Sequence, residues 1–176
     1  LTPPIYCSVD LRNSGFKLAP VDTNLYPGGF NNLGAAFLPL AVQAATAAIE
    51  KICPEAKNLL LVPENHTRNK WYLENVATLA AILRQTGLEV RIGSLNPEIT
   101  APTEFETATG KKLRVEPLVR VKSGAGSRLG VEGFDPCAIL VNNDLSAGIP
   151  PILEGLTGQV LLPPLHAGWA LRRKSV

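Results

Sequence analysis

The chain has 176 residues, of which 45% are hydrophobic, and this is enough for one folded domain with a sizeable core. Its 17 basic and 15 acidic side chains leave a formal net charge of +2, so no long-range attraction draws it to nucleic acid or to a membrane surface. Because Pro39, Gln43 and Thr46 interrupt the longest apolar run and no secretory signal opens the chain, we expect a cytoplasmic protein without nucleic-acid or membrane partners.

The first third of the chain is predicted to form a strand, a long polar loop and a helix. Residues 5–9 are a short apolar run, and residues 10–34 are rich in Gly, Pro, Asn and Asp. A loop of this length is uncommon in a compact domain unless it has a function. Alanines and apolar residues spaced by three and four predict a helix over 35–52, which Pro54 ends.

The middle of the chain alternates strand, helix and strand. Residues 58–62 form a continuous apolar run, as expected for a parallel strand that is covered on both faces. Thr67 or Asn69 is expected to cap a helix that runs to Gln85, with Gly87 as its stop. Residues 88–92 are predicted to form the next strand.

The rest of the chain predicts a hairpin, two more strands and a short helix. Residues 103–107 and 112–121 flank Gly110 as a β-hairpin, and residues 123–127 are expected to be flexible. Strands are predicted at 136–141 and 159–162, with a short helix within 146–156. This order predicts an α/β fold: a mostly parallel, open, Rossmann-like sheet with helices on both sides, in which 96–130 is an inserted hairpin and flexible segment.

Polar residues cluster after the predicted strands, and parallel strands place such clusters at one edge of the sheet, where ligands bind in open α/β folds. Arg12, Lys17 and Arg68 are expected to meet carboxylates, Asp22 or Asp144 an ammonium group, and the asparagines to fix orientation. Arg68 is the more notable because a cation is unfavourable at a helix start. The candidate substrate-binding residues are Asp10, Arg12, Lys17, Asp22, Asn24, Asn31, Asn32, Asn65, His66, Arg68, Asn142, Asn143, Asp144 and His166.

Each of these residues also has a purely structural interpretation. Asp10 and the polar residues 142–144 would satisfy backbone groups at strand ends, and His66 would bond within its own loop. Gly28 and Gly29 would form only a tight turn, and the basic residues 172–174 would be a solvated tail.

Familiar catalytic and nucleotide motifs are absent from the sequence. It contains no GxGxxG, GxxxxGK[ST] or GxSxG, and its two histidines exclude a His-rich metal site. Cys7, Cys53 and Cys137 have no CxxC spacing and are predicted to be reduced, with Cys7 and Cys137 as small buried hydrophobes. No catalytic residue and no metal ligand is therefore assigned, and the chain looks like a binding half without its catalytic half.

Several blocks of sequence resemble the proteobacterial-type glutamate–cysteine ligases. The longest is SVDLRNSGFKLAPVDTNLYPGGFNNL at 8–33. Further similar blocks are PENHTRN at 63–69, GFDP at 133–136, NNDLS at 142–146, PPLHAGW at 163–169 and RRKS at 172–175. The resemblance covers nearly the whole chain.

The resemblance implies an ATP- and magnesium-dependent ligase of the ATP-grasp type, which joins the γ-carboxylate of glutamate to the amine of cysteine through an acyl phosphate. This is the first step of glutathione synthesis. Members of the family are much longer, so residues 1–176 are expected to be a single substrate-side, pre-ATP-grasp domain that is joined to an ATP-grasp part. The absence of Met, even at position 1, also suggests a piece of a longer protein.

The fragment alone is then expected to bind neither ATP nor Mg²⁺, and its partners are glutamate, cysteine, the ATP-grasp part of the same chain and a possible second copy in a homo-oligomer. Two alternatives stay open. One is a stand-alone amino-acid-binding or sensor module. The other is a related ATP-grasp ligase with a different amine substrate.

Overall fold

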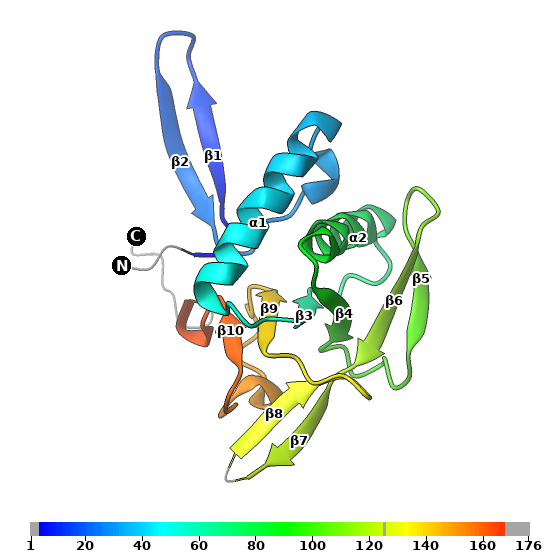
Figure 1. Cartoon of the computed structure of the whole chain (residues 1–176). Helices are drawn as coiled ribbons and strands as arrows, with labels where there is room; N and C mark the ends of the chain where they lie inside the picture. Colours follow the sequence, from blue (N-terminus) through cyan, green and yellow to red (C-terminus); the bar gives the residue numbers. More distant parts are fainter. Residues whose placement is uncertain (1–3, 125, 168–176) are drawn as a thin grey trace.

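A six-stranded sheet forms the centre of the computed structural model, which describes residues 4–124 and 126–167 (Figure 1). Its strand order is β10-β9-β3-β4-β6-β5. The strands are β3 (Asn58–Pro63), β4 (Glu89–Ser94), β5 (Thr103–Glu106), β6 (Lys112–Pro117), β9 (Ala138–Asn142) and β10 (Val160–Leu162). Neighbours pair in parallel except β5, which runs antiparallel to β6. The predicted α/β class with a mostly parallel sheet is therefore confirmed.

The central strands carry apolar side chains on both faces. Leu59 and Leu61 of β3 pack into one core cluster, whereas Leu60 and Val62 pack into the other. All four are fully buried. A strand with two buried faces has no polar alternation, and this is why β3 and β9 are visible in the sequence as unbroken apolar runs.

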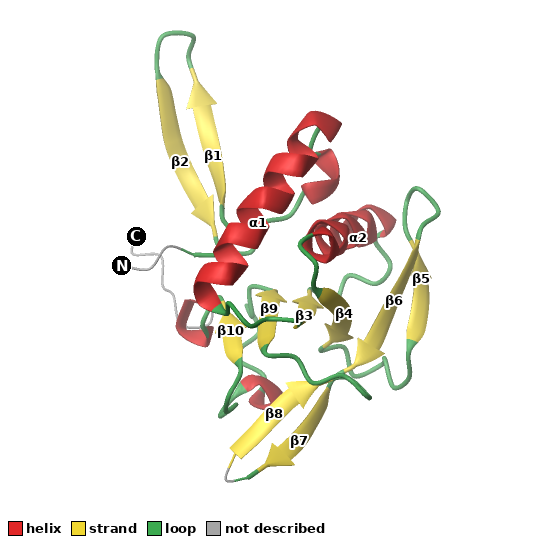
Figure 2. Ribbon diagram, viewed as in Figure 1, coloured by secondary structure: helices red, strands yellow, loops and turns green. Residues whose placement is uncertain are grey.

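Both α-helices lie on the same face of the sheet (Figure 2). They are α1 (Leu38–Ile52), which follows the 3-10 turns η1 (Phe30–Asn32) and η2 (Ala35–Phe37), and α2 (Lys70–Gln85). Leu73, Val76 and Leu79 of α2 join the core cluster on that face. As predicted, Asn69 caps α2: its side-chain oxygen accepts hydrogen bonds from the backbone N–H groups of Trp71 and Tyr72.

The prediction of helices on both faces was wrong. The second face is covered by the ribbon of β7 (Val119–Ser123) and β8 (Gly126–Gly130) and by residues 131–134 and 145–153 on either side of β9. Within 146–156 only η3 (Pro151–Leu153) is helical, because Pro150 lacks the N–H that a longer helix needs and Gly148 has a left-handed backbone. A last 3-10 turn, η4 (Leu165–Ala167), follows β10.

The predicted first strand of the sheet is instead part of a separate ribbon. β1 (Ser8–Asn13) pairs antiparallel with β2 (Leu18–Asn24), and the ribbon projects from the body beside α1 (Figure 1). Gly15, with φ of 88°, forms its turn. Nearly every side chain of the ribbon is exposed. The region expected to be an irregular loop therefore begins as paired strands, because backbone pairing needs no buried face.

The hairpin of β5 and β6 extends the main sheet, since β6 also pairs in parallel with β4. The predicted second arm, 112–121, divides near Leu118 into β6 and β7. β7 pairs with β8, so Ser123, Gly126 and Ser127 of the segment expected to be flexible lie in strands.

The helical segment Ala35–Ile52 is long and apolar enough to cross a membrane, and little of it is buried. One such helix is weak evidence for a membrane protein, because core helices of other proteins pass the same test.

Cys7 is exposed and Cys137 half-buried, which corrects the expectation that both are buried. The Sγ atoms of Cys53 and Cys137 lie 3.6 Å apart.

Candidate functional site

The carboxyl ends of β3, β4, β9 and β10 meet at one edge of the sheet because these strands are parallel. Buried Asn142, the last residue of β9, joins this edge to the N-terminal segment. Its Nδ2 donates to Tyr6 Oη at 2.9 Å and to the Pro27 carbonyl oxygen at 3.0 Å. Asn142 therefore holds the two segments that lead into and out of the ribbon, and its amide nitrogen is committed to structure.

Asn143 and Asp144 also satisfy backbone groups. The Asn143 side chain donates to the Pro63 carbonyl at 3.3 Å and accepts from the Leu145 N–H at 2.9 Å. The Asp144 carboxylate accepts from the Ser146 N–H at 2.9 Å. These bonds fix the turn at which Leu145 adopts a φ of 53°, so the structural interpretation holds for Asn143 and for one oxygen of Asp144.

Glu64 links the loops after β3 and β9. Its Oε1 accepts a hydrogen bond from the Asp144 N–H at 2.7 Å. Burial raises the pKa of Glu64, and the nearby charge of Asp144 raises it further, against the lowering effect of that hydrogen bond. A half-buried carboxyl group with a raised pKa beside a ligand edge is a typical functional-site feature.

The beginning of α2 is packed against the same edge. Tyr72 Oη accepts a hydrogen bond from the Glu64 N–H at 2.8 Å, and the His66 ring lies edge-on to the Tyr72 ring with centroids 5.1 Å apart. Burial raises the pKa of Tyr72. The loop 63–69 is therefore held in a fixed position over the end of β3.

Two pockets flank the start of α2, and both include Asn69. The amide pocket, about 530 Å³, is lined by Gly28, Gly29, Asn31, Asn32, Asn69, Trp71, Tyr72 and Asn75. The arginine pocket, about 320 Å³, is lined by Asn65, His66, Thr67, Arg68, Asn69, Asn96 and Glu98. The first offers neutral amide groups, and the second offers a cation, an imidazole and a carboxylate.

The structure brings some of the predicted site residues together and separates others. Asn31 and Asn32 line the amide pocket, while Asn65, His66 and Arg68 line the arginine pocket. The end of β9 and the turn after it hold Asn142, Asn143 and Asp144 at the sheet edge. His166 is exposed and lies in η4, after β10. The predicted residues that lie instead on the projecting ribbon are Asp10, Arg12, Lys17, Asp22 and Asn24.

The ribbon residues form no common pocket with Arg68 and Asn143 in the described part of the chain. Asp22 accepts from the Thr23 N–H, and Asn24 accepts from the Tyr26 N–H at 2.8 Å. Asp10, Arg12 and Lys17 are exposed. The ribbon can contribute to the sheet-edge site only if another part of the protein covers both.

Sequence reasoning missed Asn75, Trp71 and Tyr72, which form the α2 wall of the amide pocket. One signal was present for Asn75. It lies three residues after Tyr72 and four before Leu79, so the helical period places a polar side chain on the apolar stripe of α2. Asn75 is 3% exposed, and its Oδ1 accepts from the Phe30 N–H at 2.9 Å.

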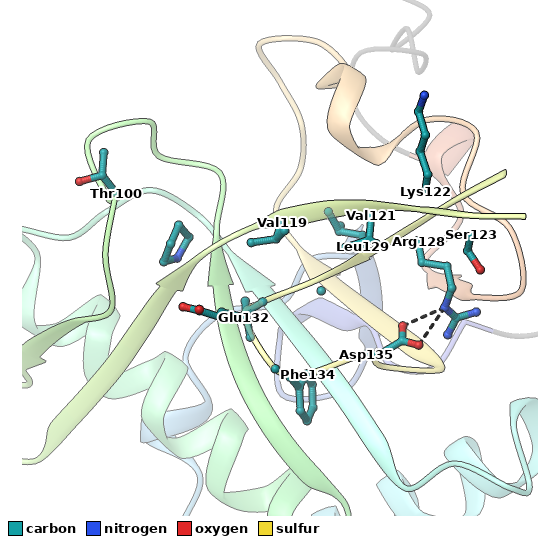
Figure 3. Close-up of a pocket in the computed structure, with 14 residues that line it drawn as sticks. Thr100, Val119, Val121, Lys122, Ser123, Arg128, Leu129, Glu132, Phe134 and Asp135 are labelled. Carbon is teal, nitrogen blue, oxygen red and sulfur yellow. Dashed lines mark hydrogen bonds and ion pairs between the residues drawn. The ribbon is translucent and has the colours of Figure 1, made fainter.

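A larger pocket, about 670 Å³, lies away from this edge along the β7–β8 ribbon (Figure 3). It is lined by apolar Val119, Val121 and Phe134 and by charged groups that include Arg128 and Asp135. Arg128 donates to Asp135 at 2.8 Å and to the carbonyl oxygens of Gly158 and Pro136. Because the guanidinium N–H groups of Arg128 are used in hydrogen bonds within the protein, we place the functional site at the sheet edge rather than in this pocket.

No cluster of metal-ligating side chains is found in the described ranges 4–124 and 126–167. These ranges contain no group of three or more His, Cys, Asp or Glu side chains that could hold a metal ion. The basic residues Arg172, Arg173 and Lys174, noted in the sequence, lie outside the described residues.

Fold and site together define an α/β domain that presents polar loops and an amide-rich pocket at the carboxyl edge of a mostly parallel sheet. The glutamate-cysteine ligase (GshA) family model matches residues 1–176, and the chain belongs to this family. This confirms the family resemblance inferred from the sequence blocks. No curated protein matches the chain.

A solved structure from Methylobacillus flagellatus KT, provisionally named a gamma-glutamylcysteine synthetase, is similar to this chain throughout. The two are 66% identical with a TM-score of 0.88, and the match covers 97% of this chain and 39% of the other. The chain thus spans 39% of the length of that protein.

Proposed function

We propose that this chain is the substrate-side domain of an ATP-dependent ligase that joins the γ-carboxylate of glutamate to the amine of cysteine. The observation that carries the proposal is the family match over all 176 residues. The 66% identity to a protein provisionally named a gamma-glutamylcysteine synthetase supports the same reaction.

The reaction needs an activated carboxylate, because an amine does not displace hydroxide from a carboxylate. In the proposed reaction the γ-carboxylate of glutamate takes the terminal phosphoryl group of ATP to form an acyl phosphate. The amine of cysteine then attacks the acyl carbon and phosphate leaves with the C–O bond electrons. Holding both amino acids close together is the contribution expected of a substrate-side domain.

We assign ATP and Mg²⁺ to the part of the enzyme outside this chain, an ATP-grasp part to which this pre-ATP-grasp domain would be joined. We further propose that the enzyme is cytoplasmic. We also propose that two copies of the whole protein form a homo-oligomer.

The arginine pocket supports a role in holding an amino-acid carboxylate. Arg68 is exposed and has no hydrogen-bond or ion-pair partner among the described residues, whereas the neighbouring Lys70 pairs with Glu106 at 3.1 Å. A guanidinium without a protein partner is suited to bind a carboxylate in two places. Within the same proposal, Arg12 and Lys17 would meet further carboxylates and Asp22 or Asp144 an ammonium group.

The test is an assay of the full-length enzyme. ADP should be released only when glutamate and cysteine are both present, and mass spectrometry should find γ-glutamylcysteine. Arg68→Ala should raise the KM for one amino acid by roughly tenfold or more, through the loss of a charge-assisted hydrogen bond, and leave the KM for ATP unchanged. Lys57→Ala, at the opposite edge of the sheet where β3 begins, is the matched control.

Other outcomes would support different functions. ADP release with another amine and none with cysteine would indicate a ligase with a different substrate. Amino-acid binding without ADP release would indicate a sensor module.

A further inference from the structure

The inference concerns Asn75, the buried amide in the wall of the amide pocket. Its Nδ2 is hidden from solvent and has no hydrogen-bond partner among the described residues. The orientation of the amide is fixed, because the Phe30 N–H can only donate and so requires Oδ1 opposite it, at 2.9 Å. The remaining group is a donor without an acceptor, which is rare for a buried side chain in a folded protein.

The surroundings of Asn75 favour a negatively charged acceptor. Neither Asp nor Glu is among the residues that line the amide pocket. The pocket lies at the N-terminal end of α2, a helix of 16 residues, where the helix dipole favours an anion. Arg68, which lines the neighbouring arginine pocket, lies one residue before the cap Asn69 and has no protein partner among the described residues.

The wall of the amide pocket opposite α2 includes Gly28 and Gly29. Gly28 has no atom within 4 Å of where a Cβ would lie, and Gly29 has a φ of 78°. A ligand would reach the buried Nδ2 only after a small shift of this glycine-containing loop, and the proposal includes that shift.

We propose that the amide pocket is a carboxylate subsite, in which Asn75 Nδ2 donates a hydrogen bond to the α-carboxylate of one amino-acid substrate. The assignment rests on the proposed ligase function for the identity of that substrate. Asn32, on the opposite wall, would contribute a second donor. Neither residue takes part in bond making, so both are positioning and specificity residues.

The decisive variant is Asn75→Asp in the full-length enzyme. The new side chain keeps the oxygen that accepts from Phe30 and replaces the orphan N–H₂ by a second oxygen, which repels a carboxylate. We expect the KM for one amino acid to rise by about tenfold to a hundredfold while the KM for ATP is unchanged. Gln85→Glu makes the same chemical change at the exposed far end of α2 and should alter neither KM.

Substrate analogues identify which carboxylate binds. The wild-type enzyme should prefer cysteine to cysteamine, or glutamate to its α-amide, and Asn75→Asp should abolish that one preference. Asn32→Ala, an exposed substitution that spares the core, should raise the same KM by a smaller factor. Unchanged amino-acid KM values in both variants would overturn the subsite.

Failure of the carboxylate subsite can be distinguished from failure of the proposed ligase function. If the full-length wild-type protein makes no γ-glutamylcysteine, that function fails, and thermal-shift titration with glutamate and cysteine still tests the pocket. Stabilisation of the wild-type protein that Asn75→Asp loses and Gln85→Glu keeps would support the carboxylate subsite, and equal shifts in all three proteins would overturn it.

Discussion

The Nζ of Lys111 lies 2.6 Å from Oε1 of Glu74, a buried carboxylate of α2. Thr109 donates to the other oxygen through its hydroxyl, at 2.7 Å, and its backbone N–H, at 3.2 Å. The turn between β5 and β6 is thus attached to α2. Burial alone would raise the pKa of Glu74, but the bonds from Lys111, Thr107 and Thr109 outweigh it and lower the pKa to about 2.

This pKa predicts how stability depends on pH. A carboxyl group whose pKa is lower in the folded state stabilises the protein above its unfolded pKa, near 4.5, and the stabilisation is lost as the pH falls toward 2. The shift corresponds to on the order of 3 kcal/mol. Urea denaturation from pH 6 to pH 2 should therefore show a steeper loss of unfolding free energy for the wild type than for Glu74→Gln. Parallel curves would contradict the lowered pKa.

The capping role of Asn69 gives a second prediction. Asn69→Ala removes the acceptor for the Trp71 and Tyr72 N–H groups and should lower the unfolding free energy by about 1 kcal/mol. Asn69→Asp keeps an acceptor at the positive end of the helix and should retain most of the stability. Thermal melts followed by circular dichroism compare the two, and equal losses would show that the cap contributes nothing.

The sheet core gives a third prediction. Leu140 of β9 is fully buried, so Leu140→Ala should cost about 2–5 kcal/mol through lost burial and a residual cavity. Leu40→Ala, at a side chain that is 58% exposed, is the control and should change stability far less. Chemical denaturation of both variants measures the difference. A large effect at Leu40 would mean that another part of the protein covers α1.

Close packing at Gly130 gives a fourth prediction. A Cβ at this position would overlap the carbonyl oxygen of Phe134, so Gly130→Ala must displace the backbone that closes the β8 end of the larger pocket. We expect a loss of unfolding free energy of about 1–3 kcal/mol. Gly34→Ala, where a Cβ would make only ordinary contact with the Phe37 ring, should be tolerated. A Gly130→Ala melting temperature equal to that of the wild type would refute the clash.

The buried parts of the fold were predictable because burial leaves a pattern in the sequence. The apolar runs at β3 and β9 and the helical period of α2 all reflect contact with a core. The β1–β2 ribbon was missed because its exposed side chains carry no such pattern. The helix expected within 146–156 failed because prolines and glycines in that segment limit it to one short turn.

The candidate site was predictable only in part. Because β3 and β9 pair in parallel, the segments that follow Pro63 and Asn142 begin at the same edge of the sheet, as the sequence order predicts. Whether a polar side chain at this edge binds a ligand or a backbone group depends on three-dimensional distances, and the spacing of residues along the sequence does not give them. Asn142 and Asn143 bond to the protein itself, whereas the orphan donor belongs to Asn75, which lies in a helix interior where sequence reasoning expects packing.

The exposed β1–β2 ribbon gives this domain an apolar surface. A two-stranded ribbon without a packed face is only marginally stable in water, yet this one displays Val9, Leu11, Phe16, Leu18 and Val21 to solvent. Residues 8–24 belong to the longest of the sequence blocks that resemble the ligase family. If a longer protein covers the ribbon, as proposed, hydrogen exchange should be fast along these strands in the isolated domain and slow in the full-length protein, so that their backbone amides report on assembly.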